Sequence, residues 1–411
     1  MPEFLSLVTP DEALLKLFSE INPEIKHISV PTHQALGKVI TEDVISPQNL
    51  PEFKRSTVDG YAVLSKSTYG ASESLPAYLK IIDEVPMGDT PDFSISDQNS
   101  ALIHTGGMLP EGADAVVMLE DTQILDSGEI EVYRAVAQGE NVIEVGEDVK
   151  IGERVLTKGT QLRPAEIGGL MALGITKLKV AKAPVFGILS SGDEVIPPDQ
   201  IPRPGEVRDI NSYTLGALIE DLGGGVIHYG IIADSRQEML NAVKKAQQEC
   251  DHLIVTAGSS ASARDLTSEI MNELGDPGVL VHGISIKPGK PTIFSVAGDQ
   301  IMIGLPGNPV SALVIAIVLV APVIEAYLGI KDPRPKPTIS AELSVNISSQ
   351  AGREDWIPVK LNRTSQGNYI AEPVFGRSNL IFILARSDGL VKIPPSATGL
   401  EAGTLVNVHL I

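Results

Sequence analysis

The feature that most constrains the fold is an alternation of apolar, strand-like runs and helical segments in the middle of the chain. Apolar runs at residues 185–189, 226–232 and 252–256 are separated by helical segments at 211–222 and 236–249. This alternation predicts a parallel sheet with helices on both faces. Ligands bind at the carboxyl ends of the strands in such sheets, so we expect the binding site on the loops that follow them.

Polar residues and glycines occupy these loops. They are Gly192 and Glu194, Asp234, Gly258, Ser259 and Asp265, Lys287 and Lys290, and Gly307 and Asn308. Loops that follow parallel strands should converge on one rim of the sheet. Asp234 has a second interpretation, because Asp234 and Ser235 also stand where a cap of the helix at 236–249 is expected.

The stretch 286–313 combines a hairpin with a helix start. Two short apolar runs at 292–296 and 301–305, joined through a Gly-Asp pair, predict the hairpin. Asn308 and Pro309 then favour a helix start, because asparagine is a good N-cap and proline suits the first helical position.

Such a loop favours a bound anion, above all a phosphate, because free backbone N–H groups point out of it. Lys287 and Lys290 would add full positive charges nearby. The alternative is an ordinary strand–turn–helix with two solvated lysines, since short Gly/Pro motifs are weak on their own.

Composition excludes several classes of protein. The formal net charge of −20 argues against broad binding to nucleic acid or acidic membranes. The single cysteine, Cys250, excludes an internal disulfide framework and a Cys-rich zinc site. The 7 histidines are scattered without metal-ligand spacing.

We expect a soluble, cytoplasmic protein. The N-terminus has neither a basic region nor a long apolar core, so no signal peptide is predicted. The longest apolar run, residues 310–324, contains Ser311 and Pro322 and is shorter than the roughly 18–20 residues of a membrane-spanning helix. It is predicted to be a buried helix.

The chain length suggests about two to four domains. Thr9, Pro10 and Glu12 predict a capped first helix. The expected fold class is multidomain α/β: a parallel-sheet α/β/α domain, a helical linker domain, a small β-rich domain and a C-terminal all-β domain. The expected boundaries are 1–50 with 146–180 for the helical linker domain, 51–145 for the inserted β-rich domain, 181–330 for the α/β domain and 331–411 for the C-terminal domain.

Asp59 lies in a dense polar turn before a short strand. Asp-Gly pairs are common in turns, so Asp59 has both a structural and a catalytic interpretation.

Seven motifs together resemble one known family. RSTVDGYAV, HTGGMLPEGADAVV, GEDVKIGE, SSGDEV, AGSSASARDLT, IKPGKP and GLPGNPVSA follow one another along essentially the whole chain. Each is weak alone, but their order and spacing are similar to those of the molybdenum-insertion proteins of molybdenum-cofactor biosynthesis, the MoeA type and the E domain of gephyrin.

The resemblance implies an elongated homodimer of four-domain chains, with a MogA-like, molybdopterin-binding α/β domain. The cleft would lie between this domain of one subunit and the β-rich domain of the other. The implied reaction inserts molybdate into adenylylated molybdopterin and releases AMP, with Mg²⁺ assisting. An upstream molybdopterin adenylyltransferase and acceptor molybdoenzymes are the implied partners, without nucleic acid or membrane.

The resemblance also implies residue roles. Asp59, Thr105, Asp148, Glu194, Asp234 and Asp265 would be catalytic, and Glu194 and Asp265 would also hold Mg²⁺. Lys287, Lys290, Gly307, Asn308 and Ser311 would hold the pterin and phosphate end, and Gly192, Gly258 and Ser259 would also bind the cofactor. Arg353 and Ser378 would complete the cofactor-binding set at the edge of the cleft, where a purely structural role is the alternative.

One loop departs from the pattern. Much of the family has two glycines followed by V-S-V-G where this chain has Gly258-Ser259-Ser260-Ala261-Ser262-Ala263. The departure leaves tungstate open as the preferred oxyanion. Two further functions also stay open: the adenylyl transfer that precedes insertion, and a molybdopterin-binding carrier or scaffold.

Overall fold

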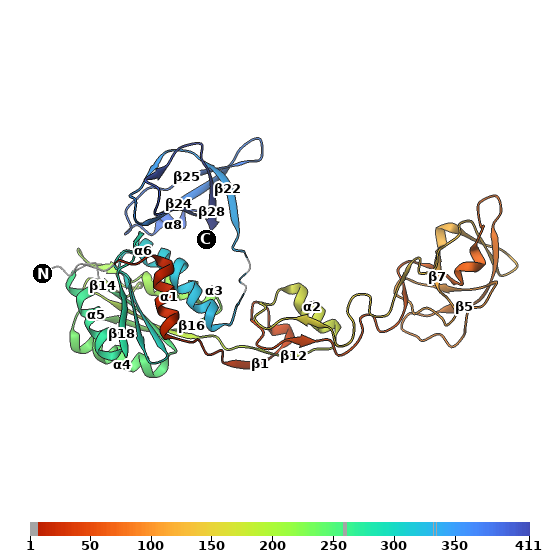
Figure 1. The fold of residues 1–411 in the computed structure, drawn as a ribbon, viewed down its shortest axis with the longest axis horizontal. Coiled ribbons are helices and arrows are strands. Elements are labelled where there is room, and N and C mark those ends of the chain that lie inside the picture. The colour runs from red at the N-terminus through yellow and green to blue at the C-terminus, as the bar shows by residue number, and fades with distance from the viewer. Residues whose placement is uncertain (1–6, 258–260, 332, 334) are drawn as a thin grey trace.

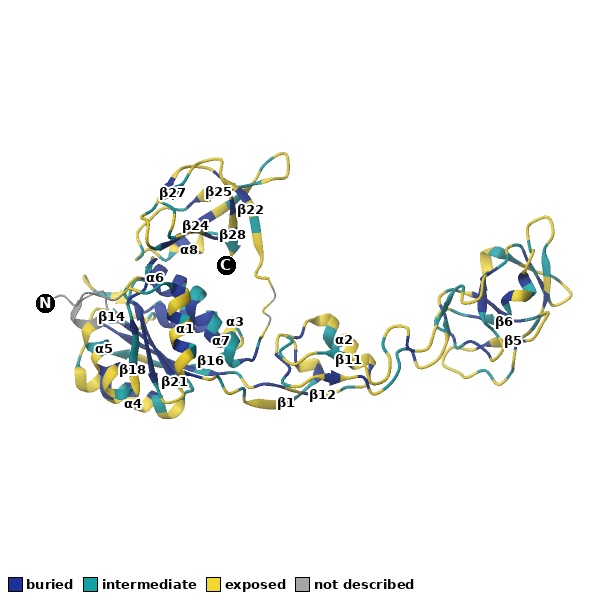
Figure 2. Ribbon diagram, in the orientation of Figure 1, coloured by how far each residue is buried: buried dark blue, intermediate teal, exposed yellow. Residues whose placement is uncertain are grey.

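The computed structural model describes residues 7–257, 261–331, 333 and 335–411. The molecule is elongated (Figure 1): an α/β body and a C-terminal barrel lie together at one end, and a β-rich domain lies at the other. A narrow arm joins the two ends. Buried residues gather mainly at the two ends, while the arm has a smaller buried cluster and is otherwise largely exposed (Figure 2).

A six-stranded sheet forms the centre of the α/β body. Its order is β16 (Gly225–Ile232), β13 (Val185–Ser191), β17 (His252–Ala257), β21 (Gln300–Pro306), β20 (Ile293–Ala297) and β18 (Pro277–His282). The first four strands are parallel, and β20 is antiparallel to both of its neighbours. The predicted parallel sheet and the predicted hairpin, with Ala297 opposite Gln300, are therefore confirmed.

Helices cover both faces of this sheet and make it the middle of three layers. One face packs against α1 (Pro10–Glu20), α3 (Asn211–Asp221), α6 (Pro309–Ile315) and α7 (Ala321–Tyr327), and the other against α4 (Arg236–Glu249) and α5 (Ala261–Leu274). A π-helical turn, Ala316–Val320, joins α6 to α7.

The segment Pro309–Tyr327 is the one helix, among the residues described, that is long and apolar enough to cross a membrane. Within the 18-residue window that meets this test, 61% of the residues are buried in the body. Ala312, Ile315 and Leu319 are fully buried in the core beneath the sheet. This packing agrees with the predicted buried helix.

Helix α1 lies on the α/β body. Its capping box forms as predicted, since Thr9 Oγ1 accepts from the Glu12 N–H at 3.2 Å and the Thr9 N–H donates to Glu12 Oε2 at 2.8 Å. Ala13 and Leu17 are fully buried in the core that also contains Phe294 of β20. The helix thus packs away from residues 146–180, with which the sequence analysis grouped it.

The arm is a small structure with its own core. β1 (His27–Pro31) pairs with β12 (Lys177–Ala181), and β2 (Val44–Ile45) pairs with β11 (Arg154–Leu156). A 3-10 turn, Thr32–Gln34, and helix α2 (Pro164–Ala172) pack beside them.

The distal β-rich domain contains a second six-stranded sheet. Its order is β7 (Ala115–Met118), β4 (Gly60–Val63), β6 (Asn99–Ile103), β5 (Ala77–Val85), β9 (Glu129–Val132) and β8 (Thr122–Ile124). Two 3-10 turns (Ser65–Thr68 and Leu119–Asp121) and the pair of β3 (Arg55–Ser56) with β10 (Val142–Ile143) complete it. Gly60 is required in β4, because a Cβ there would lie 1.9 Å from the Val117 carbonyl oxygen.

The C-terminal strands close into a barrel. It contains β24 (Glu354–Arg363), β25 (Tyr369–Pro373), β22 (Thr338–Leu343), β28 (Leu405–Leu410) and β26 (Gly389–Ile393), which pairs back to β24. The C-terminal part also contains the pair of β23 (Ile347–Ser348) with β27 (Gly399–Leu400) and the short helix α8 (Phe382–Ala385). In the α/β body, a short pair of β14 (Val195–Ile196) with β15 (Val207–Arg208) lies between β13 and α3. A short strand of the α/β body, β19 (Ile286–Lys287), pairs with β24 and joins the two parts.

Candidate functional site

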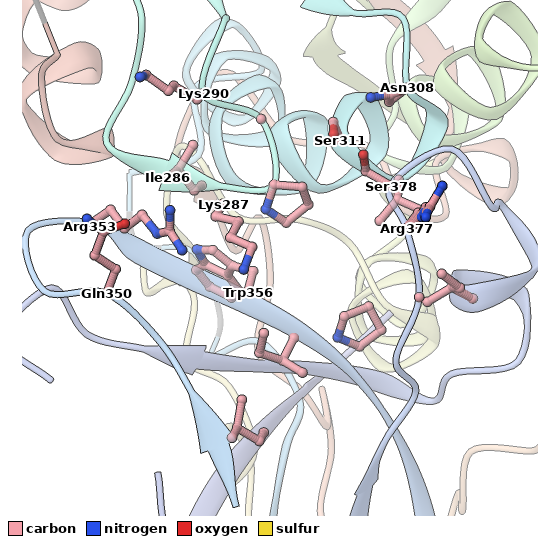
Figure 3. A pocket seen from close by; sticks show the side chains of 18 of the residues that line it. Ile286, Lys287, Lys290, Asn308, Ser311, Gln350, Arg353, Trp356, Arg377 and Ser378 are labelled. Atoms are coloured by element: carbon pink, nitrogen blue, oxygen red, sulfur yellow. The ribbon is translucent and has the colours of Figure 1, made fainter. Parts of the chain in front are cut away.

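A cavity of about 1200 Å³ lies between the α/β body and the C-terminal barrel. Six residues that the sequence analysis assigned to substrate binding line it: Lys287, Lys290, Asn308, Ser311, Arg353 and Ser378. Figure 3 shows these side chains on elements of both parts. The structure thus brings together residues that are far apart in the sequence.

The loop 287–290 forms one wall of the cavity. Gly289 has a φ of +118°, and a Cβ there would lie 2.3 Å from Ile315 Cγ1. Only glycine allows the loop to pack this closely on the end of α6. The two flanking lysines are thereby held at the cavity.

The helix start at the cavity differs in one respect from its prediction. Asn308 is the N-cap and Pro309 the first helical residue, as expected, but the Asn308 side chain makes no capping hydrogen bond. The Val310 N–H donates to the Ser378 carbonyl oxygen at 3.0 Å. One N–H group that the sequence analysis left free for an anion is therefore used to hold the C-terminal barrel.

The cavity wall is cationic. Lys287, Lys290, Arg353 and Arg377 line it, and no aspartate or glutamate is among the described residues that do so. Lys290 and Arg377 make no ion pair with any residue that the structure describes. In a chain with a net charge of −20, this wall is a local concentration of positive charge.

Lys287 and Arg353 share a carboxylate behind the wall. Arg353 Nε donates to Asp355 Oδ1 at 2.8 Å, and Lys287 Nζ lies 3.7 Å from Asp355 Oδ2. Asp355 has no exposed side-chain surface. Sequence analysis missed this residue, because a single acid in a strand gives no sign of what lies across from it.

The carboxyl ends of β13, β16, β17 and β21 lie along one rim, as predicted from the parallel register. Asp234 does not cap α4 with its side chain. Its Oδ1 accepts from Ser191 Oγ at 2.5 Å, and its N–H donates to Asp193 Oδ1 at 3.1 Å. The helix-cap interpretation is wrong for Asp234, which ties the loop after β16 to the end of β13, whereas Ser235 does occupy the N-cap position, without a side-chain hydrogen bond.

Two further rim residues, Asp209 and Asn211, escaped the sequence analysis. Asp209 is 6% exposed, and its Oδ1 accepts from the Ser212 N–H at 3.1 Å. Asn211 Nδ2 donates to the Gly307 carbonyl at 2.8 Å, while its buried Oδ1 has no partner among the described residues. The run Asp-Ile-Asn-Ser at a helix start on the ligand side of the sheet was the available signal.

The predicted metal ligands do not form a cluster. Glu194 is exposed and folds back over Gly192, where an added Cβ would lie 2.8 Å from Glu194 Oε2. Asp265 is exposed on α5, so its prediction as a loop residue is wrong. Within the described part of the chain, no group of three His, Cys, Asp or Glu side chains could hold a metal ion. Gly258 and Ser259 lie outside the described residues.

Asp59 and Thr105 meet at the distal β-rich domain. Asp59 Oδ1 accepts from the Thr105 N–H at 2.8 Å and lies 3.3 Å from Thr105 Oγ1. His104, which the sequence analysis did not single out, lies between two acids: its Nδ1 is 3.7 Å from Asp59 Oδ1, and its Nε2 is 3.0 Å from Glu84 Oε1. Asp59 is thus held by neighbours and still more than half exposed, with 57% of its side chain accessible.

Asp148 lies between β10 and β11, where its N–H donates to the Leu50 carbonyl and its side chain is exposed. Asp59, Thr105 and Asp148 therefore belong to the distal end and the adjoining arm. The cationic cavity is at the opposite end (Figure 1). One chain does not bring these two groups of predicted residues together.

A second cavity, of about 690 Å³, lies near the amino-terminal end of β17 and includes His252. The Ile301 N–H donates to His252 Nδ1 at 3.3 Å, and Nε2 has no described partner. Burial lowers the pKa of His252 to about 4, so the ring is neutral at pH 7. This cavity contains none of the predicted site residues.

Comparison with known families covers nearly the whole chain. Residues 8–174 match the model of the MoeA N-terminal region (domain I and II), residues 187–326 match the "Probable molybdopterin binding domain", and residues 340–411 match the MoeA C-terminal region (domain IV).

Individual relatives and a solved structure agree with these family matches. A protein of Methanocaldococcus jannaschii named for molybdopterin biosynthesis is 37% identical over 97% of this chain and 95% of its own length. The molybdopterin molybdenumtransferase of Haemophilus influenzae is 31% identical over 98% of both chains. The crystal structure of a molybdopterin biosynthesis MoeA protein from Pyrococcus horikoshii superposes with a TM-score of 0.86 at 32% identity, covering 99% of this chain and 100% of the other.

Proposed function

This chain belongs to the MoeA family of molybdenum cofactor biosynthesis, and we propose that it inserts molybdate into adenylylated molybdopterin with release of AMP. The observation that carries the proposal is the cationic cavity. Molybdate is a dianion, and the adenylylated substrate contains a diphosphate. A largely acidic chain needs such a local group of lysines and arginines to bind either one.

The proposed substrate matches the cavity in size and chemistry. About 1200 Å³ exceeds the volume of typical small-molecule sites and leaves room for a pterin with a nucleotide. Lys287, Lys290 and Arg353 offset charge on oxyanions, and Ser311 and Ser378 offer hydroxyl groups. Asn308 and Gly307 stand at the helix start, where oxyanions are favoured.

The functional unit in this proposal is a homodimer. Asp59 and Thr105 belong to the distal end and Asp148 to the adjoining arm, so in this proposal they act at a cationic cavity that a second copy supplies. There Asp59, held by Thr105, would orient a molybdate oxygen or the water that attacks the diphosphate. The domain boundaries at 1–50 with 146–180, 51–145, 181–330 and 331–411 belong to the same proposal, except that α1 packs in the core of the α/β body.

Mg²⁺ fits the rim as an ion that comes with the diphosphate. Exposed Glu194 and Asp265, and the carboxylates of Asp193 and Asp234, offer oxygen donors near the carboxyl ends of the strands. Mg²⁺ commonly uses one or two carboxylates, several waters and substrate phosphates, so an open rim without a dedicated cage is compatible with it. Bound there, the ion would neutralise charge that develops as the phosphoanhydride breaks.

The cellular setting follows from the same chemistry. The proposed substrate comes from a molybdopterin adenylyltransferase, and the product goes to acceptor molybdoenzymes. We place the protein in the cytoplasm, without nucleic-acid or membrane partners.

The test is a purified reaction that contains Mg²⁺ and adenylylated molybdopterin. We expect AMP release that depends on molybdate, measured by chromatography. Repeating the reaction with tungstate gives the oxyanion preference. Adenylylation of molybdopterin from ATP without AMP release on molybdate would move the chain one step earlier. Tight pterin binding without either reaction would make it a carrier.

A further inference from the structure

Asp355 is a buried carboxylate that contacts two cations of the cavity wall. Arg353 Nε donates to its Oδ1 at 2.8 Å and Arg353 Nη2 to its Oδ2 at 3.4 Å. The Lys287 ammonium lies 3.7 Å from Oδ2. The carboxylate has no exposed surface, whereas the side chains of Arg353 and Lys287 are 31% and 56% exposed. A buried carboxylate is costly unless it is paired, so these cations account for its charge.

The two cations come from different parts of the molecule. Lys287 ends β19 of the α/β body, and Arg353 directly precedes β24 of the barrel. β19 and β24 run parallel with Lys287 opposite Asp355. The Glu354 N–H also donates to the Ser285 carbonyl at 2.9 Å. Asp355 therefore stands where the backbone of the barrel is bonded to the backbone of the body.

We propose that Asp355 is a positioning residue for oxyanion binding, which holds the Arg353 guanidinium and the Lys287 ammonium at one place in the cavity wall. The inference rests on the proposed function, in which both cations bind the oxyanion end of the substrates. Asp355 uses Nε and one Nη2 hydrogen of Arg353. The remaining guanidinium hydrogens stay available to a ligand, because the guanidinium group has five donors.

Two effects of Asp355 on an anion oppose each other. Its negative charge repels a bound oxyanion, while its contacts remove the rotamer freedom of two long side chains, which is costly to lose on binding. A role in charge alone predicts tighter binding when the charge is removed. Positioning predicts weaker binding, even though the cavity becomes more positive by one unit.

The neighbouring residue offers a matched control. Glu354 is 6% exposed on the same strand, and its Oε1 lies 2.7 Å from Lys392 Nζ. Consecutive side chains of a strand point to opposite faces, and Glu354 makes no ion pair with Arg353 or Lys287 among the described residues. The variant Glu354→Gln thus removes a buried, paired charge from β24 without touching the two cavity cations.

The experiment measures molybdate binding to the purified protein by titration calorimetry, without pterin, together with thermal unfolding and AMP release. We expect Asp355→Asn to raise the dissociation constant about 10-fold, in line with freeing two long side chains, and Glu354→Gln to leave it within about 2-fold. Unchanged or tighter binding by a folded Asp355→Asn protein overturns the inference.

Asp355→Glu covers the case in which Asp355→Asn does not fold. It keeps the charge but moves the carboxylate by one methylene, so positioning predicts weaker binding and a role in charge alone predicts wild-type binding. A wild-type protein that binds molybdate but releases no AMP would refute the proposed function and leave this inference standing. If the wild-type protein binds no molybdate at millimolar concentration, the inference about Asp355 is overturned.

Discussion

The two ends of the molecule differ in charge. The distal segment 51–145 has 17 acidic and 5 basic residues, whereas the cavity at the other end is lined by four cations and, among the described residues, by no acid. In the proposed function, the groups that bind anions and the carboxylates that act on them thus belong to opposite ends of the molecule. Within one rigid body these charges would pair with each other, as Lys287 and Arg353 do with Asp355. Separation keeps both sets available to a substrate.

The largest expected effect comes from removing one residue at each end. Lys290→Ala removes a cavity cation without a described partner, and Asp59→Asn removes the carboxylate that Thr105 holds. Each should lower molybdate-dependent AMP release by about 1000-fold, the scale for loss of a group that acts on the transition state. Sedimentation should show an unchanged oligomer. Full activity in either variant would remove that residue from the mechanism.

Mixing the two variants sharpens the comparison. If the ends of different copies form one site, heterodimers of Asp59→Asn and Lys290→Ala contain one intact pair and should recover part of the activity. Verified subunit exchange without recovery would place the whole site in one chain.

The next effect concerns the core of the α/β sheet, which belongs to neither predicted group of functional residues. His252 has a pKa of about 4 when folded, against 6.5 as its ordinary value. The unfolded chain therefore binds the proton more readily, so stability is lost as pH falls from about 6.5 to 4, by roughly 3 kcal/mol. His252→Asn, which does not titrate, should show a smaller loss in denaturant titrations over this range. An equal loss in both proteins would assign acid sensitivity to other groups.

A smaller effect tests whether local or total charge matters. Arg377→Glu places a negative charge at the cationic cavity and should raise KM for adenylylated molybdopterin about 10-fold by repulsion. Asp126→Lys changes charge by the same amount in the opposite direction, at an exposed turn of the distal end, and should leave KM within about 2-fold. A decrease of KM by a similar factor in Asp126→Lys would mean that net charge, and not the local charge of the cavity, governs binding.

The smallest effect concerns the support of Asp59. Thr105→Val removes the hydroxyl 3.3 Å from Asp59 Oδ1 but keeps the backbone N–H bond at 2.8 Å. Loss of one hydrogen bond of two should lower kcat about 5-fold, while Thr105→Ser should stay close to wild type. A Thr105→Ser protein as slow as Thr105→Val would show that the methyl group, and not the hydroxyl, is what matters.

The elements of the fold were easier to predict from the sequence than the residues of the candidate site. The alternation of strands and helices was enough to predict the sheet and its hairpin, because hydrophobic period and turn chemistry are local. The motif around Lys287 and Lys290 led to residues that line the cavity, whereas Arg353 and Ser378 lie in none of the seven motifs and were named from family resemblance alone. Their substrate roles remain predictions.

The residues that escaped prediction depend on tertiary contacts. Asp355 matters because of what lies across a strand pair, and His104 because Asp59 and Glu84 flank it in space. Helix α1 was correctly predicted as a capped helix, but capping residues do not say which part of the molecule the helix will pack on. Asp265 was placed in a loop because the serine-rich stretch before it is typical of irregular structure, whereas α5 begins at Ala261.

The pairing of β19 with β24 limits how this protein can be divided. A fragment that begins at β22 (Thr338–Leu343) would contain the whole closed barrel, and is the obvious unit to express alone. It would nevertheless lose Ile286 and Lys287, the partners of Glu354 and Asp355, and leave the start of β24 as an unpaired edge next to a buried acid. Such edges invite aggregation, so the barrel is best studied together with the body from which it borrows a strand.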